Sequence, residues 1–367
     1  MIGAFAKHLQ SIPHRFHKLK YMTNKTGRSF IERLKNGLMA VTAVFTLAYI
    51  CTALASGKQL PSNGNGNGND NKDNLEANPR GEESNELKNK IAARWKIASL
   101  DTNIIPSYFR ESQENIINRP DQLNKAFDVL CKSGRALRVL QLGDSHVAGG
   151  SYPKAVETTL ESAWGKAVND STTGIEYAYM ARNGATTKRF ATENWMKQVE
   201  KYNPDLIILS FGTNECHGMG YREEVHAAQL EDFFTMLKEV CPSAVIMLTT
   251  PPGDYLTTRR VRYVRRGKGR KARRVYSSYS RVNPMSVRCA AELEEFGEEH
   301  NLPVWDLNTI AGGELAQKNW TSANLMRPDR IHFTPEGYKM HGKLLATAIL
   351  KAYNGYINKA TNHFVKQ

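Results

Sequence analysis

The sequence predicts an α/β fold with a parallel β-sheet that is covered by helices on both faces. The first observation is that five short, mainly apolar runs alternate with longer amphipathic stretches over residues 137–354. Apolar strands separated by helices are typical of a parallel sheet buried on both sides. The second observation is that polar turns end two of these runs, at Gly143-Asp144-Ser145 and at Gly212-Thr213-Asn214. Ligands bind at the carboxyl ends of strands in such sheets.

The elements follow in chain order. The predicted strands are 137–142, 175–180, 205–211, 244–249 and 303–306. The predicted helices are 153–163, 190–201, 222–240, 285–300 and 335–354. Upstream, residues 87–130 are expected to form a helical N-terminal extension with apolar positions such as Ile97 and Phe127, broken at Pro106 and Pro120. The domain that follows is assigned to residues 131–367.

The beginning of the chain has the pattern of a membrane signal. Residues 1–36 form a basic N-terminal region, and residues 37–56 contain no charged side chain. About 20 apolar residues can span a bilayer, and Ala53-Leu54-Ala55 offers the small residues that a signal peptidase accepts. Residues 37–56 are therefore either a cleaved signal peptide or an uncleaved membrane anchor, whereas Cys51 follows a poor lipobox. Both alternatives predict an exported domain, in the periplasm or anchored to the inner membrane and facing the periplasm.

Residues 57–86 are predicted to be a flexible Asn/Gly-rich linker, because such a tract cannot bury a core. The net charge of +14 is unevenly distributed along the chain. Residues 1–56 account for +7 and residues 259–274 for +10, which leaves −3 for the remainder. The basic character therefore belongs to two local segments rather than to the whole surface.

Four cysteines follow the first 56 residues: Cys131, Cys216, Cys241 and Cys289. Their spacing matches no metal site. Two disulfides are compatible with an oxidising compartment, but four separate buried thiols are the favoured interpretation.

Three residues have the side chains that nucleophilic catalysis needs. A serine hydroxyl such as that of Ser145 is a weak nucleophile and requires an adjacent base. His332 is the candidate base, and Asp329 precedes it by three residues. This spacing in a tight loop lets the carboxylate hold one imidazole nitrogen while the other faces the serine. The alternative is that each motif by itself is a chance turn or a surface pair.

Acyl transfer also needs hydrogen-bond donors for the oxyanion that forms in the transition state. The backbone N–H of Ser145 at a helix start is one candidate, and Gly184 is a second because glycine permits close approach of the backbone. The side-chain amide of Asn214 is a third. The alternative interpretation makes Gly184 a turn glycine and Asn214 a cap at the end of a strand.

Four blocks, Gly143-Asp144-Ser145, Gly184, Gly212-Thr213-Asn214 and Asp329-x-x-His332, resemble in order those of the SGNH (GDSL-type) hydrolase superfamily. The resemblance covers about residues 137–354. It implies a flavodoxin-like three-layer α/β/α sandwich and a Ser-His-Asp serine esterase with no cofactor or metal. It further implies Ser145 as nucleophile, His332 as base and Asp329 as its orienting carboxylate, with Ser145, Gly184 and Asn214 forming the oxyanion hole.

A finer resemblance concerns the bacterial peptidoglycan O-acetylesterases. The residue after the serine is His146, where the superfamily usually has leucine, and Ala148-Gly149-Gly150 follows. The segment from Asp329 to Thr334 and the pair Gly337-Tyr338 are also similar to that group. His146 is expected to have a structural or substrate-contacting role rather than to transfer protons.

The segment 259–276 is predicted to be a protruding basic hairpin, because Val261, Tyr263 and Val275 flank a Gly-Lys-Gly turn. Its charge should attract a polyanion, and Arg266 and Arg270 are candidate substrate contacts. Export argues against nucleic acid as the partner, so an anionic envelope polymer bound through residues 259–274 is favoured. A solvated loop without a dedicated partner is the alternative.

These observations predict an exported serine esterase that removes O-acetyl groups from a cell-envelope glycan, with peptidoglycan as the favoured substrate. An acetylesterase for another polysaccharide, xylan-like or capsular, is the alternative among enzymes. A lipase or thioesterase is disfavoured because the sequence shows no extended apolar lid. The alternative of another class is a non-catalytic envelope-binding module that uses the basic hairpin.

Overall fold

Five parallel strands form the central sheet, in the order β2-β1-β3-β4-β7. The strands are β1 (Leu137–Gly143), β2 (Ile175–Ala181), β3 (Leu206–Ser210), β4 (Val245–Thr249) and β7 (Val304–Trp305). Each falls within about one residue of its predicted range, so the predicted parallel sheet is confirmed. With the two hairpin strands β5 and β6 left aside, the strand order is 2-1-3-4-5, which is that of flavodoxin-like folds.

The computed structural model describes residues 95–167, 174–265, 267 and 271–365 of the 367-residue chain. The predicted basic region 1–36, the signal or anchor 37–56 and the linker 57–86 therefore lie outside the described residues. No helix within those described ranges has the length and apolarity needed to cross a membrane.

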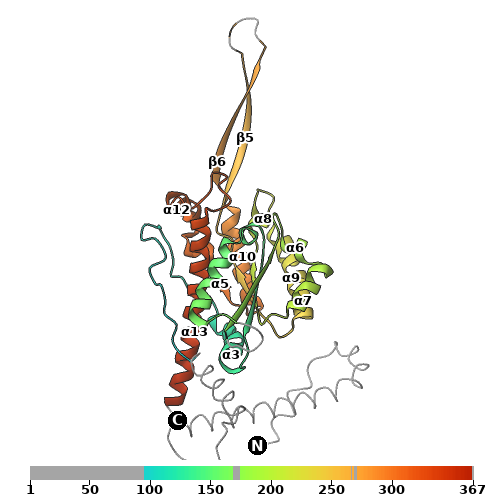
Figure 1. Cartoon of the computed structure of the whole chain (residues 1–367). Coiled ribbons are helices and arrows are strands. Elements are labelled where there is room, and N and C mark those ends of the chain that lie inside the picture. The colour runs from blue at the N-terminus through green and yellow to red at the C-terminus, as the bar shows by residue number, and fades with distance from the viewer. Residues whose placement is uncertain (1–94, 168–173, 266, 268–270, 366–367) are drawn as a thin grey trace, which may run out of the picture. The chain divides into compact units, whose positions relative to one another are not determined.

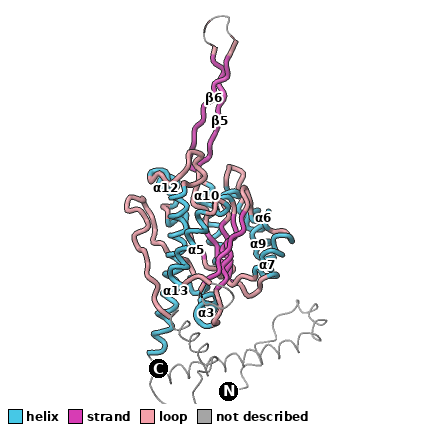
Figure 2. Tube along the Cα trace, viewed as in Figure 1, coloured by secondary structure: helices cyan, strands magenta, loops and turns pink. Residues whose placement is uncertain are grey.

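Helices cover both faces of the sheet and complete three layers (Figures 1 and 2). One face is covered by α3 (Asn124–Lys132), α5 (Ser151–Trp164) and α13 (Pro335–Val365). The other face is covered by α6 (Thr187–Phe190), α7 (Glu193–Tyr202), α9 (Glu223–Val240) and α10 (Met285–Glu299). Short helices lie in the loops: α4 (Ser145–Ala148), α8 (Thr213–Cys216), α11 (Leu307–Ile310) and α12 (Ala316–Ser322), with single 3-10 turns at Pro120–Leu123 and Gly313–Leu315.

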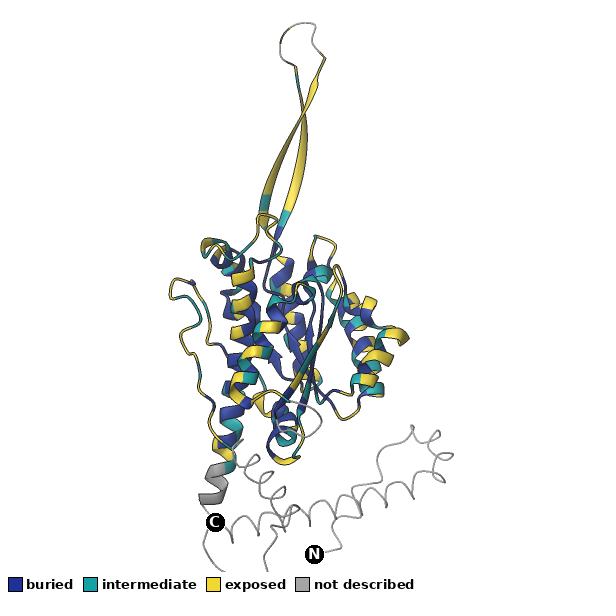
Figure 3. Ribbon diagram, viewed as in Figure 1, coloured by how far each residue is buried: buried dark blue, intermediate teal, exposed yellow. Residues whose placement is uncertain are grey.

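The apolar strands divide their side chains between two cores. In β3, Leu206 and Ile208 belong to the core under α5 and α13, whereas Ile207 and Leu209 belong to the core under α9 and α10. This division follows from the two-residue period of a strand, whose successive side chains point to opposite faces. A run that is apolar at every position therefore serves a sheet that is buried on both sides. The dark interior in Figure 3 shows these two cores.

The strand order places a crevice above β1 and β3. The chain leaves β1 towards β2 on one side, and the later strands β3, β4 and β7 lie on the other side. Loops that depart in opposite directions open a crevice at the carboxyl ends of such strands. Ser145 follows β1 and Asn214 follows β3, so both lie at this switch point.

The expectation of a helical extension over residues 87–130 is wrong for residues 95–119, which contain no helix. Within the described residues, helical structure begins at Pro120. Hydrogen bonds to α13 hold the earlier segment instead. Ala98 N–H donates to Asn354 Oδ1 at 2.8 Å, Ala98 O accepts from Asn354 Nδ2 at 2.9 Å, and Asn115 Nδ2 donates to Leu344 O at 2.8 Å. These tertiary contacts replace the hydrogen bonds that a helix would supply.

Strands β5 (Tyr255–Val264) and β6 (Arg273–Val282) form a two-stranded antiparallel hairpin that projects from the sandwich (Figure 1). The predicted hairpin is confirmed, and its paired strands extend further towards the domain than the predicted range 259–276. Two backbone bonds fix its base: Tyr255 N–H donates to Arg330 O, and Asn283 N–H donates to Asp254 O, both at 3.0 Å. Arg266 and Arg270 lie outside the described residues.

Cys131, Cys216, Cys241 and Cys289 are all buried, and no disulfide joins any two of these four described cysteines. This agrees with the favoured interpretation of four separate thiols.

Candidate active site

Ser145 is placed at the edge of the sheet by a tight transition from β1 into α4. A Cβ atom on Gly143 would lie 2.3 Å from Val147 Cγ2 and 2.9 Å from Ser210 O, so the close approach requires glycine. Asp144 then caps α4, because its Oδ1 accepts from the His146 N–H at 2.8 Å. The hydroxyl of the next residue, Ser145, is thereby presented to the crevice at the first position of the helix.

His332 joins Ser145 to Asp329. Its Nε2 lies 3.0 Å from Ser145 Oγ, and its Nδ1 lies 3.0 Å from Asp329 Oδ2. In the tautomer protonated at Nδ1, the ring donates to the carboxylate and accepts the serine proton at Nε2. Residues 187 positions apart in the sequence are therefore within hydrogen-bond distance, and the three predicted side chains form one continuous relay.

The loop before α13 holds Asp329 in its ionised form. Its Oδ1 accepts from the backbone N–H groups of Ile331 at 3.0 Å and His332 at 2.9 Å. Partial burial acts to raise the pKa of Asp329, but these two backbone bonds and the His332 side chain outweigh it and lower the pKa. The ionised carboxylate suits a group that orients an imidazole and stabilises its charged form.

Gly184 and Asn214 lie in the same crevice as Ser145. The Gly184 backbone has a φ of +67°, and open space surrounds the position of its missing Cβ. Asn214 Nδ2 donates to Asp144 Oδ2 at 3.1 Å and to Ala185 O at 2.9 Å, which orients the amide towards the serine turn and the glycine loop. The two predicted donors are therefore brought together with Ser145.

Glu215 positions these loops, although sequence reasoning gave it no role. Its Oε1 accepts from the Thr187 N–H at 2.8 Å and its Oε2 from the Gly212 N–H at 3.0 Å. The carboxylate thus ties the loop that carries Gly184 to the turn that carries Asn214. Burial raises the pKa of Glu215.

Asp144 is another buried carboxyl in this region. Only 1% of the residue is exposed, and it contacts both the Ser145 helix and Asn214. Burial raises its pKa to about 7, against the opposing effects of its hydrogen bonds and of His332. From beneath the crevice, Asp144 can hold the serine turn and the Asn214 amide in fixed positions relative to each other.

His146 lies in the interior rather than in the crevice. It is 5% exposed, and its Nδ1 lies 3.1 Å from the Tyr338 hydroxyl. Successive residues of a helix point about 100° apart, so the turn that exposes Ser145 directs His146 inwards. Burial, then the neighbouring His332, lower its pKa to about 3, which keeps the ring neutral. The structural role is therefore supported and the substrate-contacting role is not.

The crevice is a cleft of about 520 Å³. Its lining combines the predicted residues Ser145, Gly184, Asn214 and His332 with Ala148, Gly149, Asn183, Thr213, His217, Arg327, Ile331 and Tyr338. Two cationic or titratable members of this lining, His217 and Arg327, were not identified from the sequence. A lone histidine three residues after Asn214 carries no pattern of its own, because its partner Asp254 is 37 residues away.

One other group in the described chain has donors of the kind that bind metal ions. The ligand atoms of His226, Cys289 and Glu292 all lie within 4.8 Å of one another, and all three residues are buried. None of them lines the cleft. His226 Nδ1 lies 2.6 Å from Glu292 Oε2, so the group already forms a buried ion pair that connects α9 to α10.

Comparison with known proteins gives a family and a fold. The model of the GDSL-like lipase/acylhydrolase family matches residues 142–340, more than half of the chain. A solved peptidoglycan O-acetylesterase is 15% identical, covers 65% of this chain and 98% of its own, and has a TM-score of 0.50. A putative GDSL-like lipase from Parabacteroides merdae is 17% identical, with coverages of 59% and 97% and a TM-score of 0.41.

A two-domain esterase active on acetylated mannans is also similar, with 14% identity, coverages of 63% and 53%, and a TM-score of 0.41. A search of curated proteins found no match. At 15% identity and a TM-score of 0.50, the peptidoglycan O-acetylesterase supports the fold alone, whereas the family model matches the sequence of this chain. The chain belongs to the GDSL-like lipase/acylhydrolase family, within the SGNH hydrolase superfamily.

Proposed function

We propose that this hydrolase is a serine esterase in which Ser145 attacks the ester carbonyl. The observation that carries the proposal is the placement of His332 at 3.0 Å from both Ser145 Oγ and Asp329 Oδ2. His332 Nε2 takes the serine proton as the Oγ–carbon bond forms, and returns it to the departing alcohol oxygen as the ester bond breaks. Water, deprotonated by the same nitrogen, then hydrolyses the acyl-serine.

The developing oxyanion is proposed to bind between the N–H groups of Ser145 and Gly184 and the amide of Asn214. Neither of the two backbone N–H groups has a hydrogen-bond acceptor among the described residues, so both are available to a substrate. Asn214 donates both its amide hydrogens, to Asp144 and Ala185. An oxyanion therefore competes for one of these bonds, and it competes best when its charge is greatest, in the transition state.

Replacing Asn214 by alanine should lower kcat by about 10²–10³-fold with little change in KM, because the donor acts mainly in the transition state. Steady-state kinetics on a small acetyl ester measure both constants. The matched control is Asn194→Ala, whose side chain lies on the exposed surface of α7 away from the cleft. A large rise in KM at unchanged kcat would instead assign Asn214 to ground-state binding.

The proposed substrate is an O-acetylated cell-envelope glycan, with peptidoglycan favoured. The cleft is open and its lining is largely polar or glycine, with few apolar side chains to receive a long acyl chain. One solved structure with a similar fold is a peptidoglycan O-acetylesterase, and the finer sequence resemblance also favours this substrate. An acetylesterase acting on another polysaccharide remains the alternative that the experiment compares.

Acetate release tests this function. Purified enzyme is incubated with O-acetylated peptidoglycan, with acetylated xylan and with each polymer after chemical deacetylation, and free acetate is measured. We expect release from peptidoglycan at the highest kcat/KM and none from the deacetylated controls. Faster release from xylan would move the substrate to another polysaccharide, and no release from any acetyl ester would favour the non-catalytic binding module.

Export is proposed from the sequence alone. The support is the uncharged segment 37–56 behind a basic region, and the folded domain would then act in the periplasm or at the periplasmic face of the inner membrane. Fusing residues 1–86 to alkaline phosphatase, which is active only after export, should give an active reporter in a bacterial host. An inactive reporter with intact protein would contradict export.

The hairpin β5–β6 is proposed to bind an anionic polymer of the envelope. Residues 255–282 contain eleven Lys/Arg and no Asp/Glu, and the described basic side chains of the hairpin are exposed (Figure 3). Tyrosines alternate with them: Arg260 lies 4.9 Å over the Tyr279 ring, and Arg274 lies 5.7 Å over Tyr263. A two-stranded ribbon is only marginally stable by itself, and these cation–π contacts stabilise it. They also hold the guanidinium groups at separate positions, where each can bind a carboxylate.

Deleting residues 259–274 should weaken binding to acidic polymer while preserving turnover of a small neutral acetyl ester. The deletion removes +10 of charge and joins Thr258 to Val275, so residues 275–278 can form a loop that closes the paired residues Thr258 and Tyr279. Cosedimentation with sacculi at low and high salt should show a strong salt dependence for the wild type and a weak one for the deletion, because salt screens exposed charges over ~8–10 Å. Identical sedimentation of both proteins at both salts would contradict the proposal. Loss of small-ester activity would show that the hairpin shapes the cleft.

A further inference from the structure

The cleft is lined by basic side chains that have no role in the proposed acyl-transfer chemistry. His217 and Arg327 both line it, and no Asp or Glu is among the described lining residues. The ester carbonyl, the serine and the oxyanion donors account for Ser145, Gly184, Asn214 and His332. The two basic side chains therefore face the part of the substrate that surrounds the ester.

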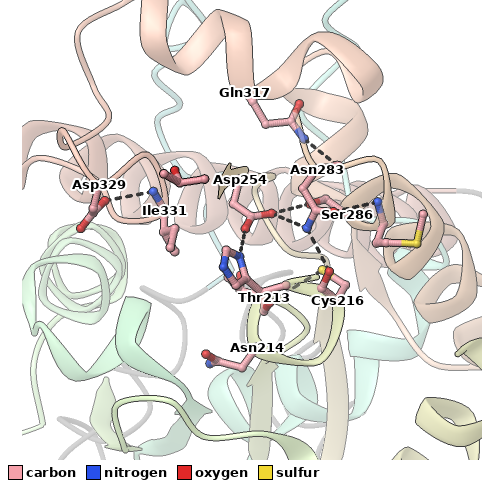
Figure 4. Close-up of polar contacts among 12 residues, drawn as sticks. Thr213, Asn214, Cys216, Asp254, Asn283, Ser286, Gln317, Asp329 and Ile331 are labelled. Carbon is pink, nitrogen blue, oxygen red and sulfur yellow. Dashed lines mark hydrogen bonds and ion pairs between the residues drawn. The ribbon is translucent and has the colours of Figure 1, made fainter. Parts of the chain in front are cut away.

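A buried carboxylate holds His217. Its Nδ1 is bonded to Asp254 Oδ2, and 36% of the His217 side chain is exposed against 2% for Asp254. Asp254 Oδ1 accepts from Asn283 Nδ2 and Ser286 Oγ, both at 2.8 Å (Figure 4). The network fixes the orientation of the ring, while its other nitrogen, Nε2, bonds to none of the described residues and is available to a ligand.

The contact between His217 and Asp254 is not needed to anchor the base of the hairpin. Asn283 Nδ2 already donates to Cys216 O at 2.9 Å and to Asp254, and the backbones of Asn283 and Asp254 are joined directly. The base of the hairpin is thereby connected to α8 without any contribution from His217. The hydrogen bond to Asp254 raises the pKa of His217, against the effect of its partial burial. Protonation of the ring, which this hydrogen bond favours, would make Nε2 a second N–H donor available to a ligand.

Arg327 supplies the second charge. Its backbone N–H donates to His332 O at 2.8 Å, and its carbonyl accepts from the Arg330 N–H at 2.9 Å, so the residue is fixed beside the catalytic loop. No ion pair or hydrogen bond joins its guanidinium group to another of the described residues. A guanidinium group at the rim of a cleft, with a fixed backbone and no ion-pair partner among the described residues, is suited to bidentate recognition of a carboxylate.

We propose that His217 and Arg327 form a carboxylate-binding subsite, so that the preferred substrate is an acetyl ester on a sugar that itself bears an acidic group. The inference rests on the proposed esterase function and narrows its substrate class. A carboxylate bound by either residue makes a charge-assisted hydrogen bond, which is stronger than a bond between neutral groups. The sugar ring between the acid and the ester would thereby be oriented with its acetyl group towards Ser145.

A pair of matched substrates tests the proposal. Mono-O-acetylated methyl glucuronoside and the corresponding glucuronamide differ only in a carboxylate or a neutral amide. For the wild type we expect kcat/KM to be at least about tenfold higher on the acid, in line with a charged hydrogen bond. In His217→Gln and in Arg327→Gln, this acid-over-amide ratio should fall by about tenfold. Arg222→Gln, which removes the same charge from an exposed position outside the cleft, should leave the ratio unchanged.

The outcomes separate this inference from the function on which it rests. Equal turnover of acid and amide by the wild type would overturn the subsite and leave the esterase intact. Equal losses on both substrates in His217→Gln would show that His217 only supports the Asn214 loop, which also overturns it. Hydrolysis of neither sugar ester, nor of a small acetyl ester, would refute the esterase itself.

Discussion

Ser145→Ala should abolish esterase activity while leaving the protein folded. Loss of the nucleophile in a serine hydrolase lowers kcat by roughly 10⁶-fold, because the covalent pathway disappears and only the oxyanion site and binding remain. The side-chain hydroxyl of Ser145 contacts His332, and removing one partly exposed hydroxyl should change the free energy of unfolding by no more than about 0.5 kcal/mol. Background-corrected acetate release and a thermal melt measure the two effects.

Covalent labelling provides the independent readout. A fluorophosphonate should modify the wild type at Ser145 and leave the alanine variant unlabelled, as peptide mass spectrometry would show. Ser151→Ala is the matched control, since Ser151 begins α5 just beyond the serine turn and does not line the cleft. Full turnover by Ser145→Ala, or labelling at another serine, would overturn the proposed mechanism.

His332→Ala should cost about as much as the loss of Ser145. The members of a catalytic triad act as a unit, so removing the base alone disables the nucleophile. Asp329→Ala should cost less, no more than roughly 10⁴-fold, because the orienting carboxylate takes no proton itself. Its side chain is 45% exposed, so water can partly replace it. The same acetate assay ranks the three variants. The double variant Asp329→Ala/His332→Ala tests whether the triad acts as a unit.

A second histidine outside the cleft provides the control for the general effect of replacing histidine by alanine. His300 forms an ion pair with Glu231 at 2.8 Å and lies at the end of α10, outside the cleft. His300→Ala should retain activity on the small ester. If Asp329→Ala lost more activity than His332→Ala, or if the double variant showed the product of the two single losses, the relay would not operate as a unit.

The strands and the ends of the strands were predictable from local sequence. A strand buried on both faces must be apolar at nearly every position, and the runs that became β1, β3 and β4 satisfy this requirement. Parallel strands end at one edge, so Ser145 after β1 and Asn214 after β3 were expected to converge. Asp329 and His332 were predictable for a related reason, because a three-residue spacing within one loop sets their separation.

The segment 95–119 was not predictable in this way. Its apolar residues, such as Phe109 and Ile117, are buried as expected, but burial does not decide between a helix and an extended chain. The decision came from partners far away in sequence, as when Asn354 bonds both the N–H and the carbonyl of Ala98. His146 shows the same limit, since its direction depended on the helical turn that follows Ser145.

The sequence by itself predicted the sheet and indicated Ser145, Asp329 and His332 as candidate catalytic residues, because each prediction depends on residues that are close along the chain or on strand ends that share an edge. Only the tertiary structure decided the charge of the cleft. His217 and Asp254 come from the loops after β3 and β4, and Arg327 comes from the loop before α13. None has a local signal, and their meeting beside Ser145 depends on how three loops fold over the same edge of the sheet.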